Sequence, residues 1–386
     1  MAPIIRSIGL VTVWIVLPLV LLNNTVVPFA WIGILWLGAC LYLMWSANRG
    51  GRKAFWFNLG FFFALVAVAE CWLSLHNGQQ HAGLKVTGSY TDGDYFVEHP
   101  LLGYAPPAGI QVTAREHDGE RLIYTVTYRI GPDGLRMVPR ADDNEPTDGS
   151  VLFFGGSFTF GEGLPDEQTL PYLAVQGFQQ SYVSYNLGFH GYGPHQMLAA
   201  LEHGLVDSVV KQAPRHVIYQ AIPDHVARVA GLSNWDRHGP KYVLNDKGEL
   251  VGRGHFDDGS SPLLTKVVDR LRKSRIFARC YDLANHVRPR DVDLMVAIVD
   301  ETQRLIDTRY PDCTFDVILW DDADNWLTTR IRSGLVDRGI RVHSIRDILL
   351  DISHDRSPYR LSQHDSHPNG RANRRIAGYL RDRVLR

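Results

Sequence analysis

Three apolar stretches occupy the first 75 residues of this 386-residue chain, at about 8–22, 26–45 and 54–75. Each is near the roughly 20 residues that a helix needs to cross the hydrocarbon of a bilayer. The first stretch lacks the small-residue cleavage pattern of a signal peptide, and two more apolar stretches follow it closely. We therefore expect residues 1–77 to form a membrane region with three transmembrane helices.

Basic residues beside these stretches predict the orientation of the chain. Arg6 precedes the first span, and Arg49, Arg52 and Lys53 lie between the second and third, whereas the loop between the first two carries none. By the positive-inside rule the N-terminus and the second loop face the cytoplasm. We expect a multi-pass protein of the cell inner (plasma) membrane whose part beyond Leu75 lies in the periplasm.

A carboxylate, Glu70, stands inside the third predicted span. An ionisable group within a membrane span is by default a hypothesis for a functional site. Glu70 lies within about two helical turns of the end of the span, however, so its side chain can extend to water. We favour this second interpretation.

The hydrophobic pattern changes after the membrane region. Residues 78–149 predict a linker and a small β region, because apolar residues alternate on both sides of 117–120 in IQVTAREHDGERLIYTVTYRI, as in a hairpin. From Ser150 onward, short runs rich in Val, Ile and Phe alternate with helical segments. Strands are predicted at 150–156, 181–188, 216–222, 315–320 and 341–345, and helices near 168–178, 194–211, 262–277, 291–309, 324–338 and 370–384.

This alternation predicts an α/β fold over residues 150–386, a three-layer αβα sandwich with a parallel sheet. A Gly-rich insertion at about 230–261 interrupts the rhythm. Ligands of such sheets bind outside the carboxyl ends of the strands, so insertions there often shape a substrate site.

Charge and cysteine content narrow the function classes. The 40 Lys and Arg nearly balance the 41 Asp and Glu, which gives no sign of a nucleic-acid partner. Cys40 and Cys71 fall in apolar stretches, and Cys280 and Cys313 fall in the soluble part. The latter two could form a disulfide, but separation along the chain says nothing about geometry, and we favour two unpaired thiols.

The strongest local motif is VLFFGGSFTFGEG, in which an apolar strand ends at Gly155 and Gly156 and delivers Ser157 into the turn before a helix. A serine in this place can act as a nucleophile while the surrounding N–H groups face an oxyanion. A phosphate site or a tight connection would give a similar pattern, although the Lys of a phosphate-binding GxxxxGK[ST] loop is absent.

A second motif, HDSHPNGRANRRIAGYL, places Asp365 and His367 before an amphipathic C-terminal helix. Residues two apart in an extended segment point the same way, so Asp365 could accept from the imidazole and fix its tautomer. The other ring nitrogen would then face a nucleophile. A polar loop that caps the last helix and a metal site of His364, Asp365 and His367 are the alternatives.

A third motif, YNLGFHGYGPHQ, follows a predicted strand and contains Gly188, Gly191 and Gly193. Glycine allows close approach of the backbone to a ligand, and a bare N–H there could donate to an oxyanion. A turn that needs positive φ is the alternative.

Together these motifs resemble the SGNH/GDSL hydrolase family, in the lineage with a small β prelude and a membrane anchor, over roughly residues 98–386. The resemblance makes Ser157 the nucleophile, His367 the general base and Asp365 its partner. The N–H groups of Ser157 and Gly191 would donate to the oxyanion. The spacing of two between Asp365 and His367 looks like that of the acetyltransferase-like members that act on exported polysaccharides.

Two positions depart from the family pattern. Gly156 stands before the nucleophile, where the family name records an aspartate. The asparagine expected after the third strand is missing from YQAIPDHVAR, where Pro223 aligns with it. Asp224 would oppose a developing oxyanion, so we expect His225 or a residue of the insertion to donate instead.

The resemblance implies a serine-dependent O-acyl ester hydrolase that acts outside the cytoplasm on an acylated cell-envelope or exported glycan. It needs no cofactor and no metal. One alternative is an O-acetyltransferase of an exported polysaccharide, which would need a membrane protein as acyl-donor partner. The other is a non-catalytic glycan-binding or assembly protein. Tyr192, Trp235 and Trp326 could stack on sugars in any of these, although such residues more often pack in a core or rim.

Overall fold

The computed structural model describes residues 38, 41–43, 45, 50–80, 86–91, 94–140, 146–177 and 180–386. The chain divides into two compact units. The first comprises Met1–Gly83 and Gly259–Asn285, and the second comprises Leu84–Asp258 and His286–Arg386. The second unit thus contains both the predicted β prelude and the predicted α/β domain, whereas residues 259–285 group with the predicted membrane region.

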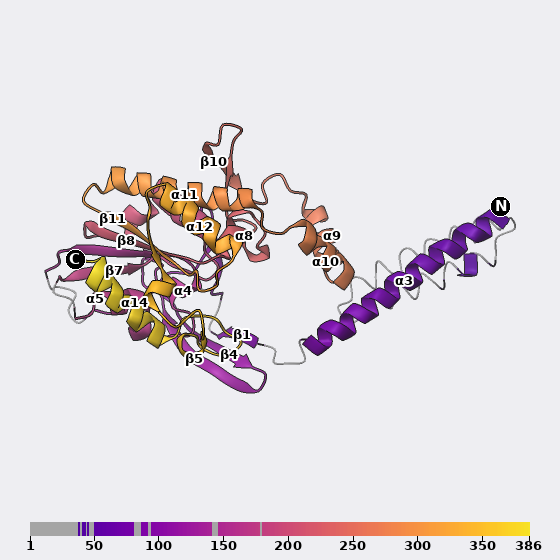
Figure 1. Ribbon diagram of the computed structural model, residues 1–386, viewed down its shortest axis with the longest axis horizontal. Coiled ribbons are helices and arrows are strands. Elements are labelled where there is room, and N and C mark those ends of the chain that lie inside the picture. Colours follow the sequence, from indigo (N-terminus) through magenta and orange to yellow (C-terminus); the bar gives the residue numbers. More distant parts are fainter. Residues whose placement is uncertain are drawn as a thin grey trace. The chain divides into compact units, whose positions relative to one another are not determined.

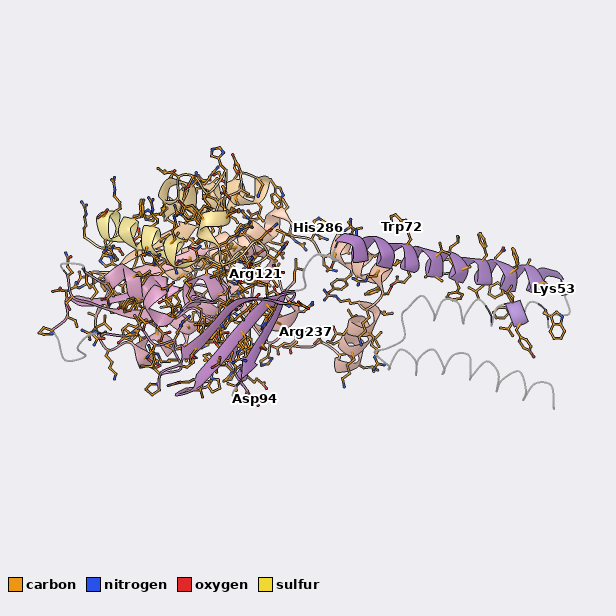
Figure 2. All side chains as sticks on the ribbon, turned by 90° about the horizontal axis from the view of Figure 1, so that it is seen from below. Lys53, Trp72, Asp94, Arg121, Arg237 and His286 are labelled. Carbon is orange, nitrogen blue, oxygen red and sulfur yellow. The ribbon has the colours of Figure 1, made fainter. Side chains whose placement is uncertain are left out.

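The first unit contains α3 (Gly50–Gln80), α9 (Pro262–Leu271) and α10 (Arg275–Ala284). Within α3 the window Lys53–Glu70 is long and apolar enough to cross a bilayer, and Figure 2 shows Lys53 and Trp72 toward opposite ends of this helix. It is the one such window among the described residues, and it coincides with the third predicted span. The first predicted span lies outside the described residues, and only a few residues of the second are described.

Glu70 does not extend to water as expected, since it is only 4% exposed. Its carboxylate accepts hydrogen bonds from the hydroxyl of Ser274 at 3.1 Å and from the N–H groups of Arg275 at 2.5 Å and Ile276 at 3.0 Å. The first N–H groups of a helix lack intrahelical partners and carry a partial positive charge. Glu70 therefore caps the N-terminus of α10.

The second unit is built on a five-stranded sheet in which all pairs are parallel, in the order β12-β11-β8-β6-β7. Figure 1 labels β7, β8 and β11 of this sheet. The strands are β6 (Gly149–Phe154), β7 (Tyr182–Asn186), β8 (Pro214–Ala221), β11 (Thr314–Leu319) and β12 (Arg341–Ser344). This confirms the predicted parallel α/β sheet. The strand order reverses between β6 and β8, and ligands bind at the carboxyl ends of strands at such a point.

Alternate residues of each strand enter opposite cores, as the twofold repeat of a strand requires. Leu152 and Phe154 pack with α6 (Pro194–Glu202), α8 (His225–Val229), α11 (Pro289–Arg309) and α12 (Trp326–Asp337). Val151 and Phe153 pack with α5 (Leu170–Val175), α13 (Ile345–Ile348) and α14 (Gly370–Arg383). The result is the predicted three-layer arrangement.

Short elements complete this unit. They are α4 (Ser157–Phe160), α7 (Leu205–Val209) and the 3₁₀ turns η1 (Asp166–Gln168), η2 (Asn234–Asp236) and η3 (Ser357–Tyr359). The predicted insertion contains η2 and an antiparallel hairpin of β9 (Pro240–Leu244) and β10 (Leu250–His255).

The predicted β prelude forms an antiparallel sheet of β1 (Val86–Thr91), β4 (Gln111–Asp118) and β5 (Arg121–Arg129), with a separate pair of β2 (Val97–His99) and β3 (Gly103–Ala105). Gly119 and Glu120 join β4 to β5, which confirms the hairpin. Tyr128 of the prelude packs with Phe160 and Phe189, which follow β6 and β7. The prelude therefore braces the loops at the carboxyl ends of these strands.

Arg136 ties the prelude to the loop after α4. It is 2% exposed, and its guanidinium donates to the carbonyls of Phe160, Gly161 and Leu164 and to the carboxylate of Asp166. All of these acceptors belong to one short segment, residues 160–166. A buried cation with this many acceptors holds the segment in one conformation.

We expect Arg136→Ala to lower the free energy of unfolding by about 3 kcal/mol, because it leaves the buried Asp166 with only its bond to Arg129. The midpoint of urea denaturation of the second unit, followed by tyrosine and tryptophan fluorescence, measures the loss. The exposed Arg121 on β5 is the control, and Arg121→Ala should change stability by less than about 0.5 kcal/mol. Equal effects of the two substitutions would contradict this role of Arg136.

Candidate active site

Two glycines shape the turn that presents Ser157. Gly155 has φ +150°, and a Cβ on it would lie 2.3 Å from the hydroxyl of Thr159. A Cβ on Gly156 would lie 2.7 Å from Nη1 of Arg228 and 2.9 Å from the carbonyl oxygen of Tyr192. Any side chain at 156, including the aspartate of the family pattern, would collide with its neighbours. The strand β6 therefore passes directly into α4, with Ser157 as its first residue.

The loop before α14 holds the other two predicted triad residues. Asn369 is the N-cap of α14, and its side chain also donates to the carbonyls of Pro358 and Arg360. Ser362 accepts a hydrogen bond from the N–H of Asp365 at 3.0 Å. The sequence analysis considered that this loop only caps the last helix. In the structure Asn369 provides that cap, and the carboxylate of Asp365 contacts His367 instead.

The structure brings Ser157, His367 and Asp365 together. Nε2 of His367 lies 2.8 Å from Oγ of Ser157, and Nδ1 lies 2.6 Å from Oδ1 of Asp365. The N–H of His367 also donates to Oδ1 of Asp365 at 2.9 Å. Asp365 is buried, so its carboxylate can fix the Nδ1–H tautomer and leave Nε2 to accept the serine proton.

A second carboxylate, Glu162, flanks His367 from the serine side. Its Oε2 lies 3.4 Å from Nε2 of His367 and 2.6 Å from Nδ1 of His190. Burial raises the pKa of Glu162, but His190, His367 and Arg228 lower it to a net value of about 2. Glu162 is therefore ionised at neutral pH. Sequence analysis missed it, although it lies within the GGSFTFGEG motif.

These carboxylates set the protonation of His367. Burial alone would lower the pKa of His367, but its hydrogen bond to Asp365 and the charges of Glu162 and Asp365 raise the pKa above its ordinary value. Both anions stabilise the imidazolium form.

Two predicted oxyanion donors lie at the crevice. Ser157 is the first residue of α4, so its N–H is one of those that a helix leaves without an intrahelical partner. Gly191 has φ +74° and lines a pocket together with Ser157. A Cβ on Gly191 would lie 2.5 Å from both Nε1 of Trp235 and the hydroxyl of Tyr104. Only glycine fits there.

The third predicted donor, His225, does not lie at the crevice. It is fully buried, its ring stacks on Tyr219, and its Nδ1 lies 2.6 Å from the Tyr219 hydroxyl. It lines neither of the pockets that contain Ser157. Helix α8 begins at this residue, with Nδ1 of His225 toward Tyr219 of β8 and Nε2 3.4 Å from the place of a Cβ on Gly156. The structure therefore does not group His225 with Ser157 and Gly191 in the pockets, and its role as an oxyanion donor stays a prediction. Arg228, one turn later, lines both pockets.

Within the described part of the chain, two pockets open onto Ser157 and His367. One, of about 370 Å³, we call the arginine-lined pocket, and the other, of about 540 Å³, the aromatic pocket. Besides Ser157, His367 and Arg228, the arginine-lined pocket includes Phe158, Asp224, Trp320, Asp322, Arg356 and Arg360. The aromatic pocket includes Phe96, Tyr104, Glu162, His190, Gly191 and Trp235. The nucleophile thus stands where two chemically different spaces meet.

The aromatic residues proposed from sequence have different positions. Trp235 lines the aromatic pocket and is 61% exposed. Tyr192 is buried and donates to the carbonyl of Tyr104, so it packs in the core. Trp326 is exposed at the start of α12 and lines neither pocket.

The metal and disulfide alternatives find no support in the described residues. Among them, no group of His, Cys, Asp and Glu side chains could hold a metal ion. Cys280 is exposed, Cys313 is buried, and both are free thiols, so the disulfide between them is excluded.

No protein-family model matches the chain, and neither does any curated protein. Similar solved structures include a lipolytic protein of the G-D-S-L family from Desulfitobacterium hafniense DCB-2, with 13% identity and TM-score 0.33, covering 61% of this chain and 99% of that chain. The acetyl xylan esterase Est2A from Butyrivibrio proteoclasticus has 10% identity and TM-score 0.34 and covers 62% and 64%.

A carbohydrate esterase family 2 enzyme with a carbohydrate-binding domain, from Corynascus thermopiles (Myceliophthora fergusii), has 15% identity and TM-score 0.30 and covers 78% and 88%. These neighbours belong to the ester-hydrolysing class that the sequence analysis predicted. Because the TM-scores are below 0.5, we base the function of this chain on the geometry of its own site.

Proposed function

We propose that the chain is a serine-dependent O-acyl ester hydrolase with Ser157 as nucleophile, His367 as general base and Asp365 as its partner. The observation that carries this proposal is the unbroken chain of hydrogen bonds from Ser157 through His367 to Asp365, at 2.8 and 2.6 Å. It stands at the meeting point of two pockets. A non-catalytic binding protein would not need this arrangement, so we set that alternative aside.

The first half of the reaction forms an acyl-enzyme. Nε2 of His367 takes the proton of Ser157 while Oγ attacks the ester carbonyl carbon, and the carbonyl oxygen becomes an oxyanion. The imidazolium, held by Asp365 and Glu162, then donates its proton to the alkoxide leaving group as the C–O bond breaks. The acyl group stays on Ser157 and the alcohol departs.

The second half repeats these steps with water. His367 takes a proton from the water as it attacks the acyl carbonyl, and the acid leaves when Ser157 recovers its proton. A sugar hydroxyl in place of water would give an O-acetyltransferase. Two pockets that meet at one serine favour this as the second candidate, since each could hold one of the two alcohols.

Arg228 takes the place of the missing asparagine as the third oxyanion donor in this proposal. Its Nη1 donates to the carbonyl of Tyr192 at 2.5 Å and lies against Gly156, next to the nucleophile. Its Nε is buried without a protein partner among the described residues. Burial lowers the pKa of Arg228, but a guanidinium keeps its charge at neutral pH. A fixed cation beside the reacting carbon stabilises an oxyanion.

We expect Arg228→Ala to lower kcat by about 10²–10³-fold with a small change in KM, because the donor acts on the transition state. Steady-state kinetics with p-nitrophenyl acetate measure the loss, and Arg228→Lys should recover only part of it. Arg237→Ala, which removes an arginine of the insertion that lines neither pocket, is the control. An unchanged kcat in Arg228→Ala would remove Arg228 from the oxyanion site.

The substrate is, in this proposal, an acylated cell-envelope or exported glycan outside the cytoplasm. The exposed Trp235, with Phe96 and Tyr104 in the same pocket, offers rings on which a sugar could stack. The apolar window Lys53–Glu70 and the basic residues before it support a membrane anchor with the enzyme on the outer side.

Because the charge of Glu162 raises the pKa of His367, we expect Glu162 to affect the pH dependence of kcat/KM. His367 must be neutral to act as a base, so kcat/KM should fall on the acid side with a midpoint above about 6.5, the ordinary histidine value. Glu162→Gln removes a negative charge that raises the pKa of His367, so the midpoint should move to lower pH. The exposed Glu167→Gln is the control and should leave it in place. A midpoint that stays fixed in Glu162→Gln would contradict the coupling.

The proposal is tested on the purified full chain in detergent with p-nitrophenyl acetate and a fluorophosphonate probe. We expect hydrolysis and covalent labelling, both retained in the exposed control Ser208→Ala. If the free ester is not hydrolysed but the probe labels Ser157, the acceptor is the open question and transfer becomes the leading candidate. Absence of both reactions would refute the enzyme.

A further inference from the structure

Helix α9 has an apolar stripe that is exposed to solvent. Leu263, Val267 and Leu271 recur every four residues, as on one face of an amphipathic helix, and they are 74%, 45% and 36% exposed. In soluble proteins such a stripe faces a core. Here it faces outward, and it belongs to the same unit as α3.

Helix α10 continues the pattern. Ile276, Cys280 and Ala284 repeat at the same spacing, Leu283 is exposed, and none of the residues of α10 is buried. Ser274 caps its N-terminus by accepting from the N–H of Phe277, so the chain makes two separate helices with a break between them. We call α9 and α10 together the amphipathic pair.

The polar side of the amphipathic pair is basic. Residues 262–284 contain six Lys and Arg but only two Asp, and Lys266, Lys273, Arg275 and Arg279 are exposed. Cations beside an exposed apolar stripe are the combination that binds the phosphates and the outer acyl region of a lipid bilayer.

A buried contact fixes the pair at one level of α3. Glu70 is the last residue of the membrane-length window, and its carboxylate caps α10 through three hydrogen bonds. Trp72, exposed just beyond, is of the type that gathers at the membrane surface. The N-terminus of α10 is thus held where the apolar part of α3 ends.

We infer that the amphipathic pair lies in the headgroup layer of the bilayer that α3 crosses, with its apolar stripe toward the acyl chains and its basic residues toward lipid phosphates. This rests on the membrane location in the proposed function. A protein partner is less well matched, because the pair is held at the end of the membrane-length window and its charge complements phosphate. Residues 259–285 then attach the chain to the bilayer a second time, between two parts of the α/β unit.

Fluorescence quenching in the full chain tests this inference. Cys280 lies on the apolar side and is exposed, so an NBD fluorophore is attached to it after Cys40, Cys71 and Cys313 are changed to alanine. The labelled protein is reconstituted in vesicles of phosphatidylethanolamine and phosphatidylglycerol. The quenchers are aqueous iodide and a lipid with a nitroxide near the carbonyl end of its acyl chain. Retained hydrolysis of p-nitrophenyl acetate shows that each variant is folded.

The matched control replaces Cys280 by serine and carries the fluorophore at Arg279→Cys, on the polar side. We expect iodide to quench the Cys280 probe less than half as strongly as the Arg279→Cys probe, since apolar faces of such helices lie about 5–10 Å inside the headgroup boundary. The lipid quencher should act in the reverse order. Equal quenching of both probes, or a Cys280 probe shielded from iodide and from the lipid quencher alike, would overturn the inference, the latter in favour of a protein partner.

A probe at Leu65→Cys in α3 separates this inference from the proposed membrane location, because Leu65 is exposed within the apolar window. Lipid quenching at Leu65→Cys without lipid quenching at Cys280 would overturn the inference and leave the membrane span intact. Absence of lipid quenching at both positions would refute the membrane span and the inference with it.

Discussion

Ser157→Ala will lower kcat for p-nitrophenyl acetate by about 10⁴–10⁶-fold, because it removes the hydroxyl that is paired with His367 and forms the acyl-enzyme. His367→Ala should lose about as much, since Nε2 of His367 is the atom 2.8 Å from the serine oxygen. The double variant should be hardly worse than either single variant, because the two residues act as one unit. Steady-state rates of the purified full chain measure all three.

Ser208→Ala and His203→Ala are the matched controls for these losses. Both residues are exposed and line neither pocket that contains Ser157, so their activities should stay near that of the unchanged protein. Unaltered activity in either Ser157→Ala or His367→Ala, with folding retained, would remove that residue from the triad.

Asp365→Asn will lower kcat by about 10⁴-fold while leaving the fold intact, because an amide cannot hold His367 in the Nδ1–H tautomer. Loss of the negative charge should also lower the pKa of His367 and move the acid side of the pH profile to lower pH. The measurement is kcat and kcat/KM across pH.

Asp324→Asn is the control for this charge change. Asp324 is a largely exposed carboxylate outside the two pockets at Ser157, and its substitution should alter neither the rate nor the pH profile. Activity of Asp365→Asn within tenfold of the unchanged protein would mean that Asp365 does not orient the base.

The parallel sheet was predictable because the residues of β6 and β8 repeat a local pattern of large apolar side chains. Ser157, Asp365 and His367 were predictable for a related reason. Each lies in a short motif whose turn or helix cap depends on neighbouring residues. Gly155, for example, supplies the positive φ of the turn before Ser157. That His367 meets Ser157, 210 residues away, is supplied by the fold and not by any single motif.

Glu162 and Arg228 were not predictable, since their roles depend on contacts between distant loops. Glu162 resembles a solvated loop residue until His190 and His367 are placed beside it. Arg228 resembles a surface cation of a helix. His225 was preferred from the sequence because Pro223 stands at the asparagine position and Asp224 would oppose an oxyanion. In the structure a helix begins at His225, and Arg228 of that helix lines the pockets at Ser157.

The sequence analysis also missed the break between two helices, and it did not predict which surface an apolar helix face contacts. The predicted helix 262–277 is two helices, α9 and α10, and the N-cap Ser274 was the signal for the break. The period of the apolar residues was correct, but a period does not say which surface an apolar face meets. For the same reason Glu70 could not be assigned to the N-terminus of α10, which lies 204 residues beyond it.

The central claim is that Ser157 carries the acyl group during turnover. The most direct test mixes the full chain with p-nitrophenyl acetate, quenches the reaction with acid within the first turnover and maps the peptides by mass spectrometry. We predict an acetyl group on Ser157 that appears within the first turnover and is absent from Ser157→Ala. Acetylation elsewhere, or hydrolysis with no modified Ser157 peptide at any time, would contradict the mechanism.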